Sequence, residues 1–300
     1  MAVSPLLDPQ TIAKGEQLGL QARQVVEGFL SGNHKSPYRG FSVEFTQHRE
    51  YVPGDDLRHL DWKVLGKNDK YVIKQYEAET NFVAHLMLDG SESMQYGSGA
   101  VNKLAYARQV AACLSYLILT QRDAVTLSLF DTETRVHVPR TGALMSVHDI
   151  CRQLAAWEPT GSTAIGPTLH KLAGRAGKRG IVVLISDLFD NEEELLSGMQ
   201  HLRFAGHEVI VLHVMDPFEL EFPFNGAVEF DGLEVTERIK TRPKDVRKTY
   251  MAELQAFLDR VRYMCERNNA HYMLLNTSHP LHEAVSSYLT FRMRVKNKRH

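Results

Sequence analysis

Leu86-Met87-Leu88-Asp89-Gly90-Ser91-Glu92-Ser93-Met94 ends an apolar run that begins at residue 82. An acid and two serines at alternate positions follow that run, which predicts a buried strand and then a loop with three oxygen-bearing side chains. Ligand sites in open α/β sheets lie at the carboxyl ends of strands. One carboxylate and two hydroxyls are hard oxygen ligands of the kind that Mg²⁺ or Mn²⁺ prefers. The alternative is a loop that only caps a helix, because Ser and Asp are also favoured at N-caps.

Further apolar runs recur downstream, with helix-length segments between them. Strands are predicted over 82–88, 181–186, 208–214 and 272–275, and helices over 102–120, 144–157, 164–178, 191–204, 243–268 and 280–290. Runs without alternation indicate strands that are covered on both faces, as in a parallel sheet. Alternating residues predict one hairpin over 124–138 and another around Asp231-Gly232, inside an excursion over 217–242. The sequence therefore predicts a doubly wound α/β domain over 81–291, with a mostly parallel sheet flanked by helices.

Residues 1–80 have a different character, with a predicted helix over 9–30 and then many polar, aromatic and turn residues. Alternation at 41–45 and 71–76 predicts short strands around a turn at 53–56. We expect this segment to pack on the main domain, because its aromatic side chains carry too much apolar area to remain in water. The aromatic residues concerned are Tyr51, Trp62, Tyr71 and Tyr76. Residues 292–300 are predicted to form a basic tail.

Composition excludes several classes of protein. The 300 residues are 43% apolar and 24% charged, as in globular domains, and a net charge of −1 gives no field that would attract nucleic acid. Three widely spaced cysteines fit a reduced compartment. No apolar run approaches the roughly 18 residues needed to span a bilayer, and residues 1–10 lack the pattern of a signal peptide. We therefore expect a cytoplasmic protein with no membrane span and no nucleic-acid partner.

Two downstream residues could complete a site with Asp89, Ser91 and Ser93. Asp187 ends the predicted strand 181–186, and Thr163 stands in a loop directly before a predicted helix. Each residue alone is explained equally well as a helix cap or a turn residue. The pattern is much more specific when the five residues are taken together, in this order and at these element boundaries.

That combination resembles a von Willebrand factor A-type domain with a metal-ion-dependent adhesion site, over about residues 80–290. The pattern of the family is D-x-S-x-S, then a threonine, then an aspartate, and it maps onto Asp89, Ser91, Ser93, Thr163 and Asp187. The resemblance implies one divalent cation, Mg²⁺ or Mn²⁺, at the C-terminal edge of the sheet. It also implies a coordination position that is open to a carboxylate from a partner protein.

The upstream segment resembles the bacterial domain-of-unknown-function family 58. The matching residues are Gly40-Phe41-Ser42-Val43-Glu44-Phe45, Arg49-x-Tyr51-x-Pro53-Gly54-Asp55-Asp56-x-Arg58-x-Leu60-Asp61-Trp62 and Lys74-x-Tyr76-x-x-Glu79. This chain departs from the pattern at Gly66-Lys67-Asn68, where relatives more often have a small residue followed by Ala-Arg. The resemblance implies work with a MoxR-type AAA+ ATPase in maturation or assembly of other proteins. The charged residues of 49–62 themselves indicate either an ion-pair network or a partner-binding surface.

Three common enzyme motifs are absent, because in each case one or two required residues are missing. Residues 97–104 lack the second glycine and the hydroxyl of a P-loop. The stretch Asp89-Gly90-Ser91-Glu92-Ser93 lacks the second glycine of the nucleophile elbow of hydrolases. Ser91 stands where a haloacid-dehalogenase phosphatase needs an acid. We therefore expect a non-enzymatic, metal-ion-dependent protein–protein interaction module. The alternative is a metal-dependent phosphohydrolase that uses the same ion as a Lewis acid.

Overall fold

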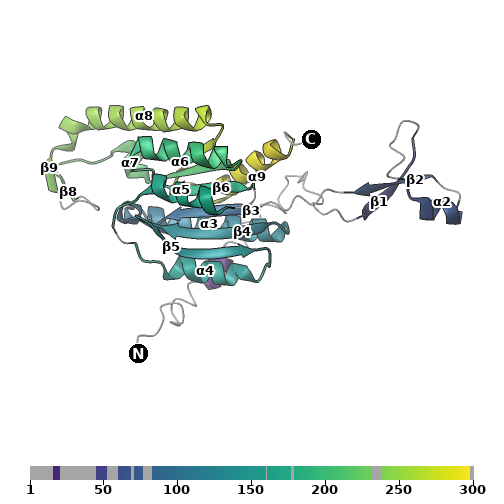
Figure 1. Cartoon of the computed structure of the whole chain (residues 1–300). Coiled ribbons are helices and arrows are strands. Elements are labelled where there is room, and N and C mark those ends of the chain that lie inside the picture. The colour runs from purple at the N-terminus through teal and green to yellow at the C-terminus, as the bar shows by residue number, and fades with distance from the viewer. Residues whose placement is uncertain are drawn as a thin grey trace. The chain divides into compact units, whose positions relative to one another are not determined.

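The computed structural model describes most of the chain, in two compact units that are each considered separately (Figure 1). The units comprise residues 1–32 with 82–300, and residues 33–81. The described residues are 16–20, 45–52, 60–68, 71–76, 83–159, 161–176, 179–226, 228–231 and 238–297.

A six-stranded sheet forms the centre of the larger unit, in the order β10-β7-β6-β3-β4-β5. All neighbouring strands are parallel except β4 and β5, which form the predicted antiparallel hairpin. The prediction of a mostly parallel α/β sheet is confirmed. The strands are β3 (Val83–Asp89), β4 (Ala124–Phe130), β5 (Thr134–Thr141), β6 (Ile181–Ser186), β7 (Glu208–Met215) and β10 (His271–Asn276).

The order of the strands reverses at β3. The chain passes from β3 to β4 and β5 on one side, and then returns to β6, β7 and β10 on the other side. Ligands of open α/β sheets bind in the crevice outside the carboxyl ends of the strands at such a reversal. Asp89 is the last residue of β3, and Asp187 directly follows β6, which is its parallel neighbour. The topology therefore brings the two acids to the same edge of the sheet.

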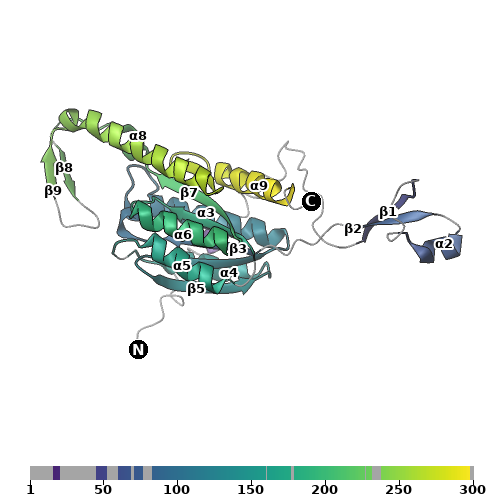
Figure 2. The same ribbon diagram turned by 45° about the horizontal axis from the view of Figure 1, so that its top comes forward.

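Helices cover both faces of the sheet (Figures 1 and 2). The side chains of α3 (Lys103–Thr120) are buried along almost its whole length, because it lies between the sheet, α4 (Ser146–Ala156) and α9 (His282–Asn297). Residues from three helices and the sheet form one apolar cluster on the other face. These helices are α5 (Ile165–Arg175), α6 (Glu192–Phe204) and α8 (Pro243–Arg267).

The smaller unit consists of the antiparallel pair β1 (Phe45–Glu50) and β2 (Val72–Tyr76), with α2 (Trp62–Asn68) between them in sequence. Residues 41–44 of the strand predicted over 41–45 lie outside the described residues, and β1 is described from Phe45 onward. Helix α2 was not predicted. Trp62 and Tyr71 are 64% and 59% exposed. The packing of this unit on the larger one stays a prediction, and residues 53–59, which include most of the predicted charged network, lie outside the described residues.

Several boundaries differ from those predicted. The last helix extends to Asn297 instead of ending at residue 290, so most of the predicted basic tail continues α9. Strands β8 (Val228–Asp231) and β9 (Arg238–Thr241) confirm the second hairpin, although residues 232–237 between them are not described. Of the helix predicted over 9–30, only residues 16–20 are described, and they are helical. Among the described residues, no helix combines the length and the apolarity that crossing a bilayer requires.

Two glycines allow α5 and α6 to pack closely. A Cβ atom on Gly166 would lie 2.6 Å from backbone atoms of Glu194, and one on Gly198 would lie 2.8 Å from the Cβ of Leu169. Gly174 is also in α5, but a Cβ there would meet no atom within 4 Å. The close packing of α5 against α6 therefore requires glycine at residue 166 but not at residue 174.

We expect Gly166→Ala to destabilise the fold by about 1–3 kcal/mol, because the added methyl group must push the backbone of α6 away. Gly174→Ala is the matched control, and it should be neutral or stabilising by up to about 1 kcal/mol, because alanine is the better helix former. Urea unfolding of both variants measures the difference. Equal effects of the two substitutions would contradict the close contact.

Candidate functional site

Asp89 is the centre of a hydrogen-bonded cluster at the switch point of the sheet. Its side chain is fully buried. One carboxylate oxygen accepts a hydrogen bond from the backbone N–H of Ser91 at 3.0 Å. The other accepts from the hydroxyls of Thr163 at 3.1 Å and Ser186 at 2.6 Å. A single carboxylate thus gathers residues from three separate segments of the chain.

The two serines of the D-x-S-x-S loop lie side by side. Their Oγ atoms are 3.0 Å apart, and Ser93 belongs to the short 3-10 helix η3 (Glu92–Gln95). The loop turns at Gly90, where a Cβ atom would overlap the indole ring of Trp157. The indole N–H of Trp157 lies 3.4 Å from the carbonyl oxygen of Gly90. Because Trp157 packs directly on the loop, the position requires glycine.

Backbone hydrogen bonds join the loops that carry the predicted site residues. The N–H of Glu92 donates to the carbonyl of Gly161 at 2.9 Å, which links the serine loop to the Thr163 loop. The N–H of Ile165 donates to the carboxylate of Asp190 at 2.6 Å, which links the Thr163 loop to the Asp187 loop. These bonds hold Thr163 between the other two segments.

Asp187 forms a buried ion pair with Lys103, which the sequence analysis did not predict. The Nζ atom of Lys103 lies 2.8 Å from Asp187 Oδ2 and 2.7 Å from Glu219 Oε1. Lys103 and Asp187 are 1% and 0% exposed. The ammonium group also lies 5.0 Å from the centre of the Phe189 ring. A completely buried lysine is rare unless it is paired, so this cation is an integral part of the site.

Asp216 and Glu219 extend the cluster to the short helix α7 (Pro217–Glu221). Asp216 caps α7 in a reciprocal capping box with Glu219. Asp216 also accepts hydrogen bonds from the backbone N–H of Ser98, at 2.9 Å, and from its hydroxyl. The loop that follows the two serines is thereby tied to α7, a helix that the sequence pattern did not reveal.

Burial raises the pKa values of two acids in the cluster, Asp89 and Glu219. Burial, and then the charge of Asp187, raise the pKa of Asp89 to about 7, although hydrogen bonds from Ser186 and Ser91 oppose the shift. Burial raises the pKa of Glu219 despite the opposing effect of Lys103. Burial alone would lower the pKa of Lys103, but its two carboxylate partners raise it above the ordinary value. Asp187 and Glu219 therefore share one ammonium group, and Asp89 adds a buried acid that Lys103 does not contact, so the cluster has more buried acids than buried cations.

The donor atoms present fit a hard divalent cation. Four of the five predicted residues are directly connected, because Asp89 contacts Ser91 and Thr163, and Ser91 contacts Ser93. The charge of Asp187 acts on Asp89. In sequence, Asp187 directly follows Ser186, whose hydroxyl donates a hydrogen bond to Asp89. The described residues contain no cluster of three or more His, Cys, Asp or Glu side chains arranged for a metal. The fit therefore depends on hydroxyl oxygens together with carboxylates, which is the chemistry that Mg²⁺ and Mn²⁺ accept.

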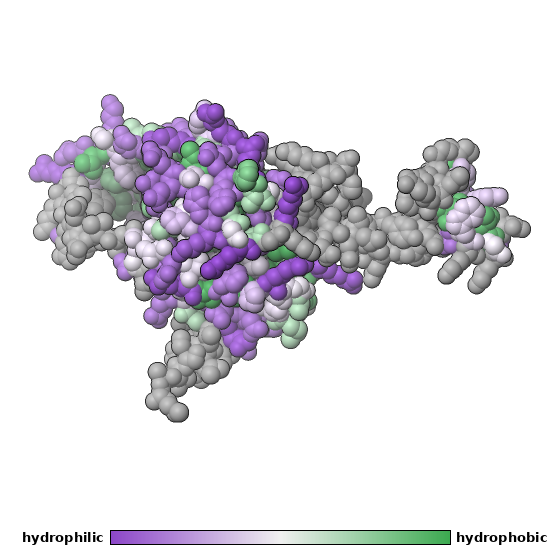
Figure 3. Space-filling view, in the orientation of Figure 1, coloured by the Kyte–Doolittle hydropathy of each residue, from purple (hydrophilic) through white to green (hydrophobic). Residues whose placement is uncertain are grey.

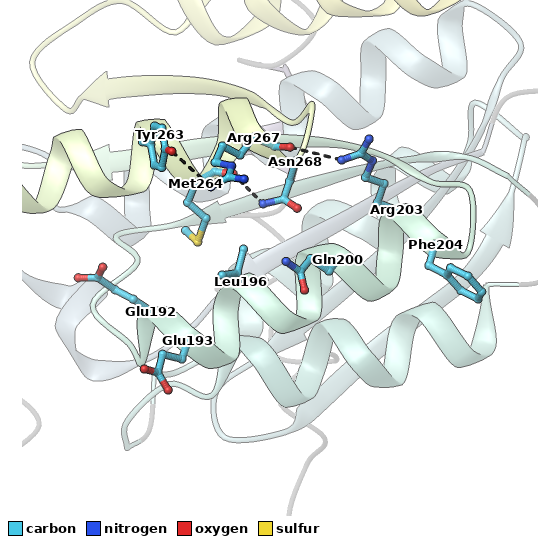
Figure 4. Close-up of a pocket in the computed structure, with 10 residues that line it drawn as sticks. All are labelled: Glu192, Glu193, Leu196, Gln200, Arg203, Phe204, Tyr263, Met264, Arg267 and Asn268. Atoms are coloured by element: carbon cyan, nitrogen blue, oxygen red, sulfur yellow. Dashed lines mark hydrogen bonds between the residues drawn. The ribbon is translucent and has the colours of Figure 1, made fainter.

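A hollow of about 830 Å³ between α6 and α8 is unrelated to this cluster (Figure 4). Its arginines are occupied locally, since Arg203 donates to the backbone carbonyl of Arg267, and Arg267 to the hydroxyl of Tyr263. Glu192 also lines the hollow, and its carboxylate is paired with Arg260 of α8. None of the five predicted site residues lines this hollow.

The family model described as "Protein of unknown function DUF58" matches residues 47–257. The chain belongs to this family. Uncharacterized proteins of Mycobacterium bovis and Mycobacterium tuberculosis are 27% identical to it over 232 residues, which cover 76% of this chain and 72% of theirs. The match to the DUF58 model spans β2, all of β1 except its first two residues, and all five predicted site residues.

Solved structures also resemble this DUF58 chain. The conserved hypothetical protein BatB from Bacteroides thetaiotaomicron superposes with a TM-score of 0.48 at 16% identity, over 71% of this chain and 98% of that one. An aerotolerance-related membrane protein from Bacteroides fragilis gives a TM-score of 0.46 at 19% identity, over 65% of this chain and 91% of that one.

We expect Lys103→Met to destabilise the protein by roughly 3–5 kcal/mol in the presence of a chelator, because it leaves Asp187 and Glu219 buried without their cation. Arg152→Met is the control, since its ion pair with Asp149 is exposed and should contribute at most about 1 kcal/mol. Chemical denaturation measures both. A Lys103→Met protein as stable as the wild type would show that the buried ion pair is not required.

Proposed function

We propose that this chain is a metal-ion-dependent protein interaction module. In this proposal a Mg²⁺ or Mn²⁺ ion at the switch point of the sheet binds a carboxylate of a partner protein. The observation that carries the proposal is the buried Asp89 carboxylate, which gathers hydroxyl groups around itself next to a second buried acid. The residues proposed to hold the ion are Asp89, Ser91, Ser93, Thr163 and Asp187.

The charge of the cluster supports this assignment. The single charge of Lys103 neutralises only part of the charge of Asp187 and Glu219. Among the described residues, no contact joins Lys103 to Asp89. A cation bound next to Asp89 would balance the remaining buried negative charge. Hydroxyl ligands contribute no charge, so the ion would keep enough positive character to attract a further carboxylate. When bound, it supplies that positive charge and an open coordination position.

Exposed aromatic side chains near the cluster support a role in docking. Phe189 follows Asp187 by two residues and is 40% exposed, and Phe218 of α7 is 38% exposed. One metal–carboxylate contact is far smaller than the roughly 800 Å² that each partner buries in a stable interface. Phe189 and Phe218 would supply apolar area beside the ion, since aromatic residues are enriched among the energetically important contacts of interfaces.

The proposed partner is a MoxR-type AAA+ ATPase, and the proposed process is maturation or assembly of other proteins. This part of the proposal depends on the resemblance of the sequence to family 58 proteins and to A-type domains.

The hydrolase alternative would need a general base within reach of a metal-bound water. Asp89 and Glu219 are each held in hydrogen bonds, and Lys103 is paired with two carboxylates. A phosphatase assay with a generic phosphate ester tests the alternative. Turnover by the wild type that Asp89→Ala abolishes would favour the hydrolase over the interaction module.

We expect calorimetry to show one site for Mg²⁺ or Mn²⁺. Asp89→Ala should abolish binding, and Ser91→Ala should weaken it by about tenfold or more, because even residues that only support metal ligands change affinity by about that factor. Asp149→Ala, on the exposed surface of α4, is the control and should bind normally. Binding that is unchanged in both site variants would remove the proposed metal site.

We expect the purified protein to bind a MoxR-type AAA+ ATPase only when a divalent cation is present. Chelator should abolish the complex, Mg²⁺ should restore it, and Ser91→Ala should lose it while remaining folded by circular dichroism. Phe189→Ala should weaken the complex without affecting metal binding. Equal binding in chelator and in Mg²⁺ would mean that the ion is structural and does not dock the partner.

A further inference from the structure

A second hollow, of about 490 Å³, lies on the sheet face that α5 partly covers. Alternate residues of β3 and β4 form its floor, and β5 and α5 form its sides. The side of the molecule shown in Figure 3 carries mainly hydrophilic side chains over α5 and β5, with small apolar patches. The lining residues are Val83, His85, Met87, Thr126, Ser128, Thr134, His137, Pro139, Arg140, Thr168, Lys171, Leu172, Arg175 and Ala176.

The charges around this hollow have one sign. Arg140, Lys171 and Arg175 are all exposed, and no Asp or Glu is among the residues that line it. Within the described part of the chain, these three cations have no ion-pair partner. Elsewhere on the surface the arginines are commonly paired, as Arg152 is with Asp149. Three unpaired cations around one concave surface favour an anionic ligand.

The floor is polar where a covered sheet would normally be apolar. Thr126 and Ser128 are each 5% exposed and His85 is 6% exposed. The Nδ1 atom of His85 lies 3.0 Å from the Thr126 hydroxyl, and the Ser128 hydroxyl lies 3.1 Å from Nδ1 of His137. The buried Nε2 atom of His85 has no hydrogen-bond partner among the described residues.

The polar floor is costly for the fold and therefore calls for an explanation. Burying hydroxyl and imidazole groups stabilises a protein less than burying apolar side chains of the same size. Several positions further along the same sheet face are apolar, as Val182, Leu184 and Val211 show. His85, Thr126 and Ser128 lie under the cationic rim, where a ligand would meet them.

We infer that this hollow binds a small organic molecule that carries a phosphate group. Guanidinium and ammonium groups together match the charge and the hydrogen-bonding geometry of phosphate. The volume exceeds that of an inorganic phosphate ion and lies within the usual range of ligand pockets. Val83, Met87 and Leu172 offer an apolar wall for the organic part of the molecule.

This site is separate from the proposed metal centre. None of the five proposed metal ligands lines the hollow, and none of the three rim cations contacts those ligands among the described residues. Loss of one site therefore need not affect the other, so the two proposals can fail independently.

Titration calorimetry of the full-length protein in chelator tests the inference, with AMP, glucose 6-phosphate, glycerol 3-phosphate and inorganic phosphate as probes. We expect at least one organic phosphate to bind saturably with a Kd below about 1 mM. Its phosphate-free counterpart, adenosine, glucose or glycerol, should bind at least about tenfold more weakly, because it leaves the cationic rim unpaired. The inference is wrong if no organic phosphate binds saturably, or if the counterpart binds equally well.

Variants of the rim provide the second arm of the experiment. Lys171→Gln and Arg175→Gln change exposed positions of α5, so both proteins should fold, and each should weaken the phosphate probe by about tenfold. Arg262→Gln, on exposed α8 and outside the hollow, is the matched control and should bind normally. Unchanged affinity in both rim variants, or an equal loss in the control, would overturn the assignment.

Discussion

The buried carboxylate of Asp89 is the group on which the rest of the site depends. A carboxylate that is removed from water loses its hydrogen bonds to water, and the protein must replace them. Asp89 accepts such bonds from one backbone N–H and two hydroxyls, which belong to three segments of the chain. Asp187 is also buried, and the cation that it contacts, Lys103, is shared with Glu219. Hydrogen bonds thus hold the loops in position, while the charge of the cluster remains only partly balanced.

The sequence predicts the parts of this arrangement that arise from local patterns. Apolar runs identify β3 and β6 because strands covered on both faces need no polar side chains, and Asp89 and Asp187 stand out where those runs stop. Contacts between distant residues were missed. Lys103 is 84 residues from Asp187 and 116 from Glu219 in sequence, and nothing near Lys103 distinguishes it from an ordinary surface lysine. Ser186 was counted only as the end of a strand, although its hydroxyl binds Asp89. The polar floor of the second hollow was missed for the same reason, because His85 and Thr126 interrupt apolar runs singly.

Two elements contribute to both proposed sites. Met87 lines the hollow and Asp89 ends the same strand, while Thr163 stands just before α5, whose outer surface carries Lys171 and Arg175. Thr168 lines the hollow and donates a hydrogen bond to the carbonyl of Ala164, the residue after Thr163. The first turn of α5 is therefore in contact with one site and adjacent to the other.

A crystal structure with Mn²⁺, measured at a wavelength where the ion scatters anomalously, tests the central claim most directly. The account predicts one anomalous peak at the switch point, held directly or through bound water by Asp89, Ser91, Ser93, Thr163 and Asp187. Clear density for these side chains without an ion, at a Mn²⁺ concentration that occupies sites elsewhere in the crystal, would contradict it.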